Sequence, residues 1–523
     1  MMKKFNYTGV CIPEKHYMVN ISNKLAQIIA LVEEGEYFTI NRPRQYGKTT
    51  TLYLLAKELK KRDAFLVLKM SFEGTGDESF SNEASFNNVF LKLCKKAYSI
   101  SGETELLPLF EQQREMKNLN DLSEFITEFV ITSGRKVVLL IDEVDSSSNN
   151  QLFLYFLGML RNKYLSRNQG DDSTFHSVIL VGVHDVRNLK LKIRPDGERQ
   201  YNSPWNIAAD FKVDLSFSPE EISTMLQEYC TIENVKMDVR QISEKLYYYT
   251  SGYPFLVSKL CRIIHDDIMP KQKITEWTAK HIEEAVQIIL YESNTNFESL
   301  IKNIENNQDL YQAVYQIIID GVDKIYNLHN PLVGKGIMYG IFNNDYKNTI
   351  KIHNRIYEQV IYNYLSSKME TTLKAASYNY RDNFLQPDGY LDFSKLLLKF
   401  QEFMHKEYSE KDLAFLERNG RLIFLAFLKP IINGKGYDFK EVQISEEKRL
   451  DVVVTYLDRH YVIELKIWHG PEAHTKGLLQ LSDYLQRRDL LQGYLIIFDF
   501  RGKKEWKQEW TRVDNKDIFM VWV

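Results

Sequence analysis

A loop between a strand and a helix near the N-terminal end limits the fold of this chain more than any other feature. Residues 36–40, EYFTI, have the apolar, β-branched pattern of a buried strand, and a helical pattern, TLYLLAKELKKR, begins at Thr51. Residues 41–50 between them read NRPRQYGKTT. A loop that enters a helix at Gly-Lys-Thr offers backbone N–H groups and the positive end of the helix dipole to phosphate groups. The sequence therefore predicts a phosphate-binding loop.

The residues of this loop have distinct expected roles. Lys48 is expected to reach the β- and γ-phosphates of a nucleotide, and Thr49 to ligate Mg²⁺. The strict pattern has a glycine five residues before Gly47, where this chain has Arg42. The predicted nucleotide-binding residues are Arg44, Gly47, Lys48, Thr49, Thr50 and, from the strand described next, Asp142.

A second strand pattern, KVVLLIDE at residues 136–143, ends in two acidic residues. Asp142 is expected to hold Mg²⁺ through water, and Glu143 to activate the attacking water as a general base. A strand that ends in Asp-Glu is common by chance, but its combination with Gly-Lys-Thr-Thr indicates a nucleotide-binding fold. The expected cofactors are ATP and Mg²⁺, with Mn²⁺ as an alternative metal.

The rest of the front half alternates strand and helix patterns, which predicts a parallel sheet with helices on both faces. The expected strands are Phe65–Phe72, Val137–Ile141, Ser177–Val183 and Phe211–Phe217. After the third of these come His184 and Asp185, where the pattern resembles that of AAA-type ATPases. The resemblance implies that one of the two senses the γ-phosphate, and the alternative is an ordinary loop residue. Gly252-Tyr253-Pro254 either packs against the nucleotide base or begins a helix with proline at its first position, and both can hold.

The C-terminal part of the chain places acidic residues inside otherwise apolar strand patterns, in RLDVVVTYLDRHYVIELKIW at residues 449–468. A hairpin of these two strands would bring Asp451 and Glu464 to the same end. Glu464 and Lys466 are two residues apart and so face the same side of their strand. On a following helical pattern, Gln480 and Tyr484 are one turn apart and share a face.

This set of residues suits one kind of chemistry. Two carboxylates and the carbonyl of Leu465 form a hard oxygen site for Mg²⁺ or Mn²⁺. Such a metal polarises a phosphate and lowers the pKa of a bound water, while Lys466 positions that water or offsets charge in the transition state. Glu-x-Lys is also common on solvated strand faces. The ordered set of five residues nevertheless favours a metal-dependent site that cuts phosphodiesters.

From about Phe400 to Val523 the chain resembles the PD-(D/E)XK nuclease superfamily, in its RecB-like branch with a Q-x-x-x-Y helix. The resemblance implies that Asp451 and Glu464 are metal ligands and that Lys466 completes the catalytic core. It also implies catalytic roles for a further set of residues, namely Gln480, Tyr484 and, as the acidic residue that a preceding helix often adds, Glu417.

Two positions near this core leave alternatives open. Glu441, in FKEVQIS, recurs in sequences of this kind, or only packs or pairs with Arg449. Lys448 stands where close relatives usually have glycine, which implies a relaxed turn with the chemistry retained.

The front half resembles AAA-like and STAND-like bacterial and archaeal ATPases, in which loops of the form R-P-R-x-x-G-K-T-T occur. A length of 523 residues predicts three or four domains. The expected fold is α/β multidomain. Its parts are a parallel-sheet P-loop ATPase core at 1–217, a helical lid at 218–295, a winged-helix-like module and linker at 296–392 with a hairpin turn at Asn343-Asn344, and an α/β PD-(D/E)XK nuclease domain at 393–523.

The order of these parts resembles bacterial AAA-ATPase-like proteins fused to a C-terminal nuclease domain. That resemblance implies ATP binding or hydrolysis that controls a Mg²⁺-dependent nuclease acting on nucleic acid, with DNA favoured. It also implies a role in defence against foreign DNA or in mobile-element biology. The alternative is an NTP-driven switch whose nuclease-like domain only binds nucleic acid or a protein. AAA-like ATPases commonly complete their sites between subunits, so a homo-oligomer stays open.

The composition limits which partners and which cellular environment are expected for the protein. The N-terminal residues have no apolar signal region, and no run approaches 18 apolar residues, so no membrane partner is expected. The four cysteines are far apart and form neither a zinc nor a disulfide pattern, which suits a reducing cytoplasm. The net charge is −3, so any surface that binds nucleic acid must be local.

Overall fold

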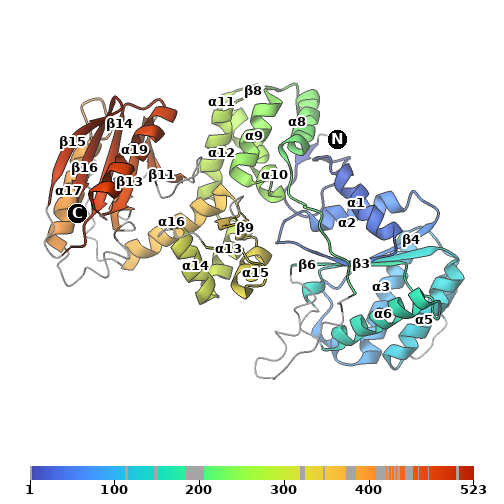
Figure 1. The fold of residues 1–523 in the computed structure, drawn as a ribbon. Helices are drawn as coiled ribbons and strands as arrows, with labels where there is room; N and C mark the ends of the chain where they lie inside the picture. The colour runs from blue at the N-terminus through green and yellow to red at the C-terminus, as the bar shows by residue number, and fades with distance from the viewer. Residues whose placement is uncertain are drawn as a thin grey trace. The chain divides into compact units, whose positions relative to one another are not determined.

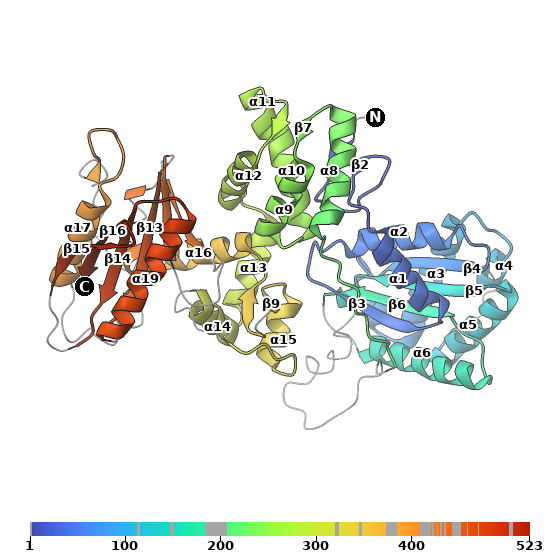
Figure 2. The same cartoon turned by 45° about the horizontal axis from the view of Figure 1, so that its top comes forward.

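The computed structural model describes residues 3–111, 116–146, 151–183, 205, 207–318, 324–344, 348–372, 384–407, 420, 423–425, 427, 428, 431, 432, 436–441, 451–457, 459–468, 470–501 and 506–523. The chain forms two compact units. The first comprises Met1–Asn296 and Leu328–Phe342, and the second comprises Phe297–Asn327 and Asn343–Val523. Figures 1 and 2 show the elements of each unit.

The first unit contains a four-stranded parallel sheet in the order β3-β6-β5-β4. Its strands are β3 (Tyr37–Asn41), β4 (Phe65–Ser71), β5 (Lys136–Asp142) and β6 (Ser177–Gly182). The register pairs Asn41 with Gly182 and Ser71 with Asp142. The carboxyl ends of the strands therefore share one edge, where α/β sheets bind ligands. The predicted parallel α/β sheet is confirmed.

Helices cover both faces of this sheet (Figure 1). The helices α1 (Ser22–Glu33) and α2 (Lys48–Leu59) lie on one face, and α3 (Glu83–Ile100), α5 (Leu119–Ser133) and α6 (Gln151–Gln169) lie on the other. Alternate strand residues, among them Leu66, Leu68, Val137 and Leu139, share a buried apolar cluster with α3, α5 and α6. The residues between them face the helices on the other side of the sheet. Because each strand is buried on both faces, its sequence is apolar throughout.

The predicted strand Phe211–Phe217 is wrong. Next to this segment, Ala209 forms a single parallel bridge with Phe38, and residues 211–217 have no ladder. The apolar alternation of the segment reflects packing. The Phe211 ring stacks on Phe38 with centroids 5.8 Å apart, and Val213 is buried. Burial of alternate residues gives the same pattern as a strand, and only the backbone hydrogen bonds distinguish the two.

A helical region follows in the first unit. Its elements are α8 (Pro219–Glu233), β7 (Lys236–Met237), α9 (Val239–Thr250), α10 (Pro254–Ile263), α11 (Met269–Gln272), β8 (Glu276–Trp277) and α12 (Ala279–Tyr291). Helix α8 begins where the sequence dictates, because Ser218 and Glu221 form a reciprocal capping box and Pro219 occupies the first turn. The N-terminal strands β1 (Lys4–Phe5) and β2 (His16–Tyr17) pack on this region, with the Phe5 and Tyr229 rings 4.9 Å apart.

The second unit starts with helices. They are α13 (Thr295–Glu305), α14 (Gln308–Ile318) and α16 (Arg355–Thr372), with a two-stranded sheet of β9 (Phe342–Asn344) and β10 (Ile350–Ile352). Helix α15 (Pro331–Met338) belongs to the first unit. The predicted turn at Asn343-Asn344 is wrong, since both residues lie within β9. The connection to β10 includes residues 345–347, which lie outside the described residues.

The second unit ends in a six-stranded mixed sheet in the order β11-β12-β13-β14-β16-β15. The strands are β11 (Gly436–Glu441), β12 (Asp451–Tyr456), β13 (Arg459–Ile467), β14 (Gln492–Phe498), β15 (Gln508–Val513) and β16 (Lys516–Trp522). The strands β13, β14 and β16 are parallel to each other, and the outer pairs are antiparallel.

Two helices flank this second sheet, α19 (Pro471–Arg487) on one face and α17 (Phe393–Glu407) on the other (Figures 1 and 2). Leu481 and Leu485 of α19 share a core with Leu495 and Ile497. The Phe393 ring of α17 instead contacts Tyr494. Tyr494 precedes Leu495 on β14 and therefore points to the opposite face of the sheet. The period of two along each strand thus assigns each residue to one helix or the other.

Replacement of Gly252 is expected to destabilise the first unit. Gly252 has φ of +71°, and a Cβ there would lie 2.0 Å from the carbonyl oxygen of Phe217. The carbonyl of Gly252 also accepts a 2.8 Å hydrogen bond from the N–H of Phe217. Neither segment can therefore move away from the other without losing this hydrogen bond. Gly252→Ala should therefore cost more than the ~1–2 kcal/mol of a left-handed alanine alone. Urea unfolding measures this loss.

Gly102→Ala is the matched control for that variant, because Gly102 has φ of +85° and no atom within 4 Å of its Cβ position. If both variants lose the same free energy of unfolding, the close contact with Phe217 is not what requires glycine.

Candidate functional site

The loop between β3 and α2 has a backbone that few residues can adopt. Gln45 and Gly47 have φ of 55° and 78°, both in the left-handed region. Gly47 is the N-cap residue of α2, and Lys48 is the first helical residue. The positive end of the helix dipole therefore lies at the Gly-Lys-Thr step, as a phosphate site requires.

Arg42 explains why this loop departs from the strict glycine pattern. Positive φ falls on Gln45 and Gly47, so position 42 makes no demand for glycine. The Arg42 guanidinium donates to the carbonyls of Asn41, at 2.9 Å, and Val213, at 2.6 Å, and lies 5.3 Å from the centroid of the Phe211 ring. Burial lowers the pKa of Arg42. Arg42 thus fastens the end of β3 to the segment that was expected to be a strand.

Lys48 is buried under this loop, with only 7% of its surface exposed. Its Nζ donates to the carbonyl oxygens of Arg42, at 2.9 Å, and Pro43, at 2.8 Å. Burial lowers the pKa of Lys48, while the carboxylates of Glu143, Asp145 and Asp142 act in the opposite direction. The lysine, the loop and the three acids therefore form one electrostatic group.

The acids of this group lie at the carboxyl end of β5. Asp142 is buried, and its Oδ1 accepts a 3.0 Å hydrogen bond from the N–H of Glu143. Glu143 is half-buried and has φ of 53°, an uncommon value for a residue with a side chain. Burial, followed by the neighbouring charge of Asp142, raises the pKa of Glu143. A carboxyl group with a raised pKa is a suitable proton acceptor at neutral pH.

Asp145 is a positioning residue that the sequence analysis missed. Its Oδ2 accepts a 2.6 Å hydrogen bond from the N–H of Val183, at the end of β6. A Cβ on Gly182 would lie 3.1 Å from the carboxylate of Asp145 and 2.9 Å from Val144. A small residue at 182 is therefore needed for the segment after β5 to meet β6. The two proposed phosphate sensors, His184 and Asp185, lie outside the described residues.

Tyr253 and Gly340 bring two distant segments against the loop. The Tyr253 hydroxyl donates to the carbonyl of Arg44 at 2.5 Å, and its ring lies 4.7 Å from that of Tyr46. A Cβ on Gly340, two residues after α15, would lie 2.8 Å from the ring of Pro43. Pro254 occupies the first turn of α10, so the expected helix start is present. Contact of Gly252-Tyr253-Pro254 with a nucleotide base stays a prediction.

The N-terminal segment is a second feature that the sequence analysis missed. The N–H of Cys11 donates to the hydroxyl of Thr50 at 3.1 Å, and the Tyr17 hydroxyl donates to Glu233 of α8 at 2.6 Å. Thr49 and Thr50 are both half-buried in the first turn of α2, and Arg44 is exposed. Residues 11–17 therefore link the phosphate loop to the helical region. The signal in the sequence was weak, because it consists of isolated aromatic residues.

A second candidate site lies in the sheet of the second unit. The register pairs Glu441 with Asp451 and Asp451 with Glu464, so three acidic positions form one row across β11, β12 and β13. Directly paired positions of antiparallel strands share a face. The Glu464 side chain is only 3% exposed and forms an ion pair with Lys466. The backbone thus brings the predicted acidic positions together.

Helix α19 holds Lys466 from the other side. The Lys466 Nζ donates to Oε1 of Gln480 at 3.0 Å. A Cβ on Gly477 would lie 3.3 Å from Cε of Lys466, so the glycine leaves room for the lysine stem. The hydroxyl of Tyr484 is buried with no hydrogen-bond partner among the described residues. An unpaired buried hydroxyl is unusual and indicates a site for a further polar group.

Some predicted residues cannot be placed in this second site. Glu417, Lys448 and Arg449 lie outside the described residues, and the side chains of Asp451 and Glu441 are not described. Among the side chains that the structure does describe, no three His, Cys, Asp or Glu residues come together as a metal-binding group.

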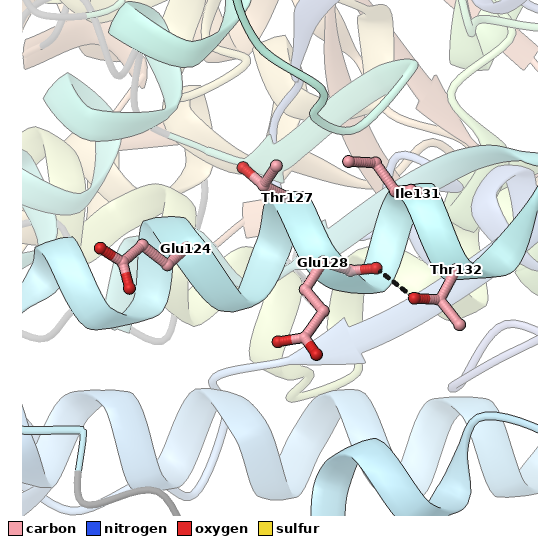
Figure 3. Close-up of a pocket in the computed structure, with 5 residues that line it drawn as sticks. All are labelled: Glu124, Thr127, Glu128, Ile131 and Thr132. Atoms are coloured by element: carbon pink, nitrogen blue, oxygen red, sulfur yellow. Dashed lines mark hydrogen bonds between the residues drawn. The ribbon is translucent and has the colours of Figure 1, made fainter.

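One hollow of the surface lies along α5, and no residue of either candidate site lines it. It has a volume of about 400 Å³ and is lined by five residues, namely Glu124, Thr127, Glu128, Ile131 and Thr132. Figure 3 shows that these side chains do not converge on a point, and Thr132 only donates to the backbone carbonyl of Glu128. This hollow brings together no set of groups that could perform chemistry.

A parallel sheet with a Gly-Lys-Thr-Thr loop and an Asp-Glu strand end on one edge defines the class of P-loop ATPase-like proteins. Residues 14–362, more than half of the chain, match the model of the AAA-like domain family. The chain belongs to the AAA-like domain family.

Similarity to individual proteins is weaker. An uncharacterised WD repeat-containing protein of Synechocystis is 21% identical over 277 residues, which are 51% of this chain and 22% of that protein. The chain thus spans about a fifth of the length of this curated relative. A Walker-type ATPase of Pyrococcus abyssi is 11% identical with a TM-score of 0.47, over 68% of this chain and 99% of that one.

The Aeropyrum pernix ORC2 protein is 13% identical with a TM-score of 0.37, over 70% of this chain and 98% of that one. The Holliday junction branch migration motor RuvB of Thermotoga maritima is 13% identical with a TM-score of 0.33, over 64% of this chain and 92% of that one. At these scores the likenesses extend no function to this chain. Across the described part of the chain, no helix is long and apolar enough to cross a membrane.

Replacement of Lys48 by alanine is expected to weaken ATP binding by at least about tenfold, since a charge-assisted hydrogen bond contributes about 1.5–3 kcal/mol. The variant removes the buried ammonium that reaches the loop. Calorimetric titration with ATP and Mg²⁺ measures the change. Lys61→Ala, which alters an exposed lysine just beyond α2, serves as control and should bind like the parent. Equal affinity of Lys48→Ala and the parent would show that this loop is not the phosphate site.

Proposed function

We propose that the first unit binds and hydrolyses ATP with Mg²⁺ and that the sheet domain of the second unit is a metal-dependent nuclease under its control. The observation that carries the nuclease half is the row formed by the positions of Glu441, Asp451 and Glu464 next to Lys466. The phosphate loop carries the ATPase half. DNA is the favoured substrate, and foreign DNA the proposed target.

The residues around the phosphate loop fit a nucleotide with Mg²⁺. Oδ1 of Asn41 and Oε1 of Gln45 are buried without a hydrogen-bond partner among the described residues. Buried polar atoms rarely stay unpaired unless a further group binds there. In the proposed complex, Lys48 holds the β- and γ-phosphates, the N–H groups from Gly47 onward contact their oxygens, and Thr49 and Asp142 hold the metal.

Glu143 is the proposed general base for hydrolysis. It follows the buried strand end directly, and its raised pKa makes it a better proton acceptor than an ordinary carboxylate. Its strained backbone, with φ of 53°, fixes the direction of the side chain relative to Asp142. We propose that Glu143 takes the proton of the attacking water.

The C-terminal row fits a hard divalent metal. The positions of Asp451 and Glu464 lie opposite each other on one face, and carboxylate oxygens are the ligands that such a metal takes. A metal bound there would polarise the phosphate and lower the pKa of a water. Resemblance to PD-(D/E)XK nucleases supports the same set. Glu441 is in register with it and joins the proposed site, and Glu417 stays a candidate for a further ligand.

The remaining residues of the row act on the substrate. Lys466 offsets the charge that develops on the phosphate, and Gln480 holds the ammonium in position through their 3.0 Å hydrogen bond. Tyr484 lies one turn after Gln480 on α19. Its buried hydroxyl has no hydrogen-bond partner among the described residues and would donate to a phosphate oxygen.

A binding role without cleavage is the second candidate. The ion pair between Lys466 and Glu464 neutralises the buried carboxylate within the protein. A domain of this kind could present the row to nucleic acid or to a protein without using a metal. Metal-dependent cleavage distinguishes the two proposals, because a binding domain would retain its affinity in a chelator and never cut.

One residue supports communication between the two halves. The Pro43 carbonyl accepts the hydrogen bond of Lys48, and the Pro43 ring packs where Gly340 leaves no room for a side chain. Gly340 belongs to Leu328–Phe342, which is part of the first unit although the chain on either side of it belongs to the second. We propose that nucleotide at Lys48 acts on the nuclease half through this segment. AAA-like subunits often complete their sites between copies, so we propose a homo-oligomer as well.

The variant Glu143→Gln is expected to bind ATP normally but to hydrolyse it about 10²- to 10⁴-fold more slowly, because only the general base is lost. In the parent, the rate should fall as pH decreases through the raised pKa of Glu143, since the protonated acid cannot accept a proton. That acid limb should be absent in the variant. Because the variant retains ATP, its nuclease rate at saturating ATP should also differ from that of the parent.

Steady-state phosphate release across pH and plasmid cleavage with ATP measure these two properties of the Glu143→Gln variant. Retention of the acid limb would exclude Glu143 as the base. Equal cleavage by the variant and the parent would show that the two halves work independently.

In the nuclease half, Lys466→Ala is expected to reduce cleavage about 10²- to 10³-fold while leaving metal binding largely intact. Glu464→Gln keeps the shape but removes a charge that the metal needs, so it should abolish cleavage with Mg²⁺ or Mn²⁺. The assay uses plasmid and single-stranded substrates with each metal, with and without ATP. Glu472→Gln changes an exposed acid in the first turn of α19 and should cut like the parent. Metal-independent cutting, or full activity of Glu464→Gln, would contradict the assignment.

A further inference from the structure

The row at the candidate nuclease site continues past Lys466. Glu464, Lys466 and Trp468 are two residues apart in turn and so share a face of the strand. The N–H of Trp468 donates to the carbonyl of Phe498 at 2.9 Å, which continues the parallel pairing of β13 with β14 by one residue. Trp468 is partly buried and packs against the apolar core under α19. The strand thus ends in an aromatic ring about 7 Å along from the lysine.

Helix α19 matches this row residue by residue. His474, Gly477, Gln480 and Tyr484 recur every three or four residues and therefore share one face of the helix. Gly477 and Gln480 meet Lys466, as described above. One turn earlier, His474 meets Trp468, with ring centroids 5.7 Å apart. The site therefore has two adjoining parts, a charged part at Lys466 and an aromatic part at Trp468.

Cations surround the aromatic part. The Arg501 guanidinium lies 5.1 Å from the centroid of the Trp468 ring, and its side chain is 58% exposed. A 2.6 Å ion pair with the buried carboxylate of Asp499 fixes Arg501 in this place. His474 also contacts Trp522, whose ring has Lys507 5.1 Å from its centroid. Contacts of His474 and Arg501 thus extend the aromatic part from Trp468 to a second ring and two cations.

We infer that Trp468, with His474 and Arg501, forms a subsite that stacks an unpaired base of a nucleic acid strand whose phosphate is held at Lys466. This inference rests on the proposed nuclease function and names the form of its substrate. Aromatic rings and guanidinium planes stack bases without regard to sequence, and nearby cations track the backbone. Bases inside a duplex are stacked on each other and cannot enter such a subsite. The subsite therefore selects single strands, or strands that have separated.

The subsite does not follow from the core of the site alone. The charged part needs only carboxylates and a lysine, and it would act on a phosphate whether or not the bases are paired. The aromatic part adds contacts that a phosphate cannot use. Its position at the end of the same strand, and on the same face of the same helix, makes the two parts available to neighbouring groups of one strand.

The test measures binding of fluorescently labelled oligonucleotides to the full chain in a chelator, so that no cleavage occurs. The same sequence is offered as single-stranded DNA, single-stranded RNA and blunt duplex DNA. Trp468→Leu is expected to weaken binding of single strands by about 5- to 150-fold and to leave duplex binding unchanged. Trp468→Phe should restore most of the affinity because it keeps a ring.

Trp510→Leu is the matched control. Trp510 is 50% exposed on β15, and its ring contacts that of Phe519. Phe519 pairs with Tyr494 of β14, which contacts α17, so Trp510 lies on the face of the sheet opposite to α19. This variant loses an exposed tryptophan of the same sheet and should bind like the parent. Equal affinities of Trp468→Leu and Trp510→Leu for single strands would overturn the inference. So would a loss at Trp468 that is the same for duplex and single strands.

A fluorescent purine in the oligonucleotide gives a second measurement that does not require the leucine variant to fold. Stacking on Trp468 should quench its emission in the parent and in Trp468→Phe, and absence of quenching in the parent would overturn the inference. Cleavage is scored separately with metal. Cutting that does not depend on Trp468 leaves the nuclease proposal standing without the subsite. Stacking without any cutting leaves the subsite standing without the nuclease.

Discussion

The parallel pairing of β3, β6 and β5 is the constraint on which the first unit depends. Because these strands are parallel and in register, their carboxyl ends lie at the same edge of the sheet. Three functionally different segments therefore meet there, namely the phosphate loop, Asp142-Glu143 and Gly182-Val183. That edge has to bury the ammonium of Lys48, which is costly without compensating charge. The three nearby carboxylates and two loop carbonyls supply the compensation. The sheet thus positions the charges, and the charges in turn make the loop geometry tolerable.

The local parts of this arrangement could be predicted from the sequence, and the long-range parts could not. The strand, the loop and the start of α2 are adjacent in the chain, and their periodicities are read within a few residues. The role of Arg42 depends on the carbonyl of Val213, 171 residues away. Likewise, the contact of Cys11 with Thr50 depends on where the N-terminal segment crosses α2. Such contacts leave no periodic signal.

The second unit shows the same division. The pairing of Asp451 with Glu464 follows from a short connection and an alternation of period two, both of which are local. The match between α19 and β13 is different, because the rotation of a helix on a sheet is set by packing. Gly477 opposite Lys466 and His474 opposite Trp468 therefore emerged only with the fold. The turn at Asn343-Asn344 failed because local turn preference is weaker than strand pairing.

A nucleotide can shift the second unit only if it binds two arrangements of the protein with different affinity. Pro43 is where such a difference can arise. Its carbonyl accepts from Lys48, and a ligand that draws the ammonium toward phosphate competes for that hydrogen bond. Its ring fixes φ at residue 43, so this part of the loop has one torsion fewer with which to absorb a change at the carbonyl. Gly340 packs on that same ring with no space for a Cβ, so any displacement of the loop reaches Leu328–Phe342. The close packing that makes glycine necessary at 340 is therefore what would transmit the state of the loop.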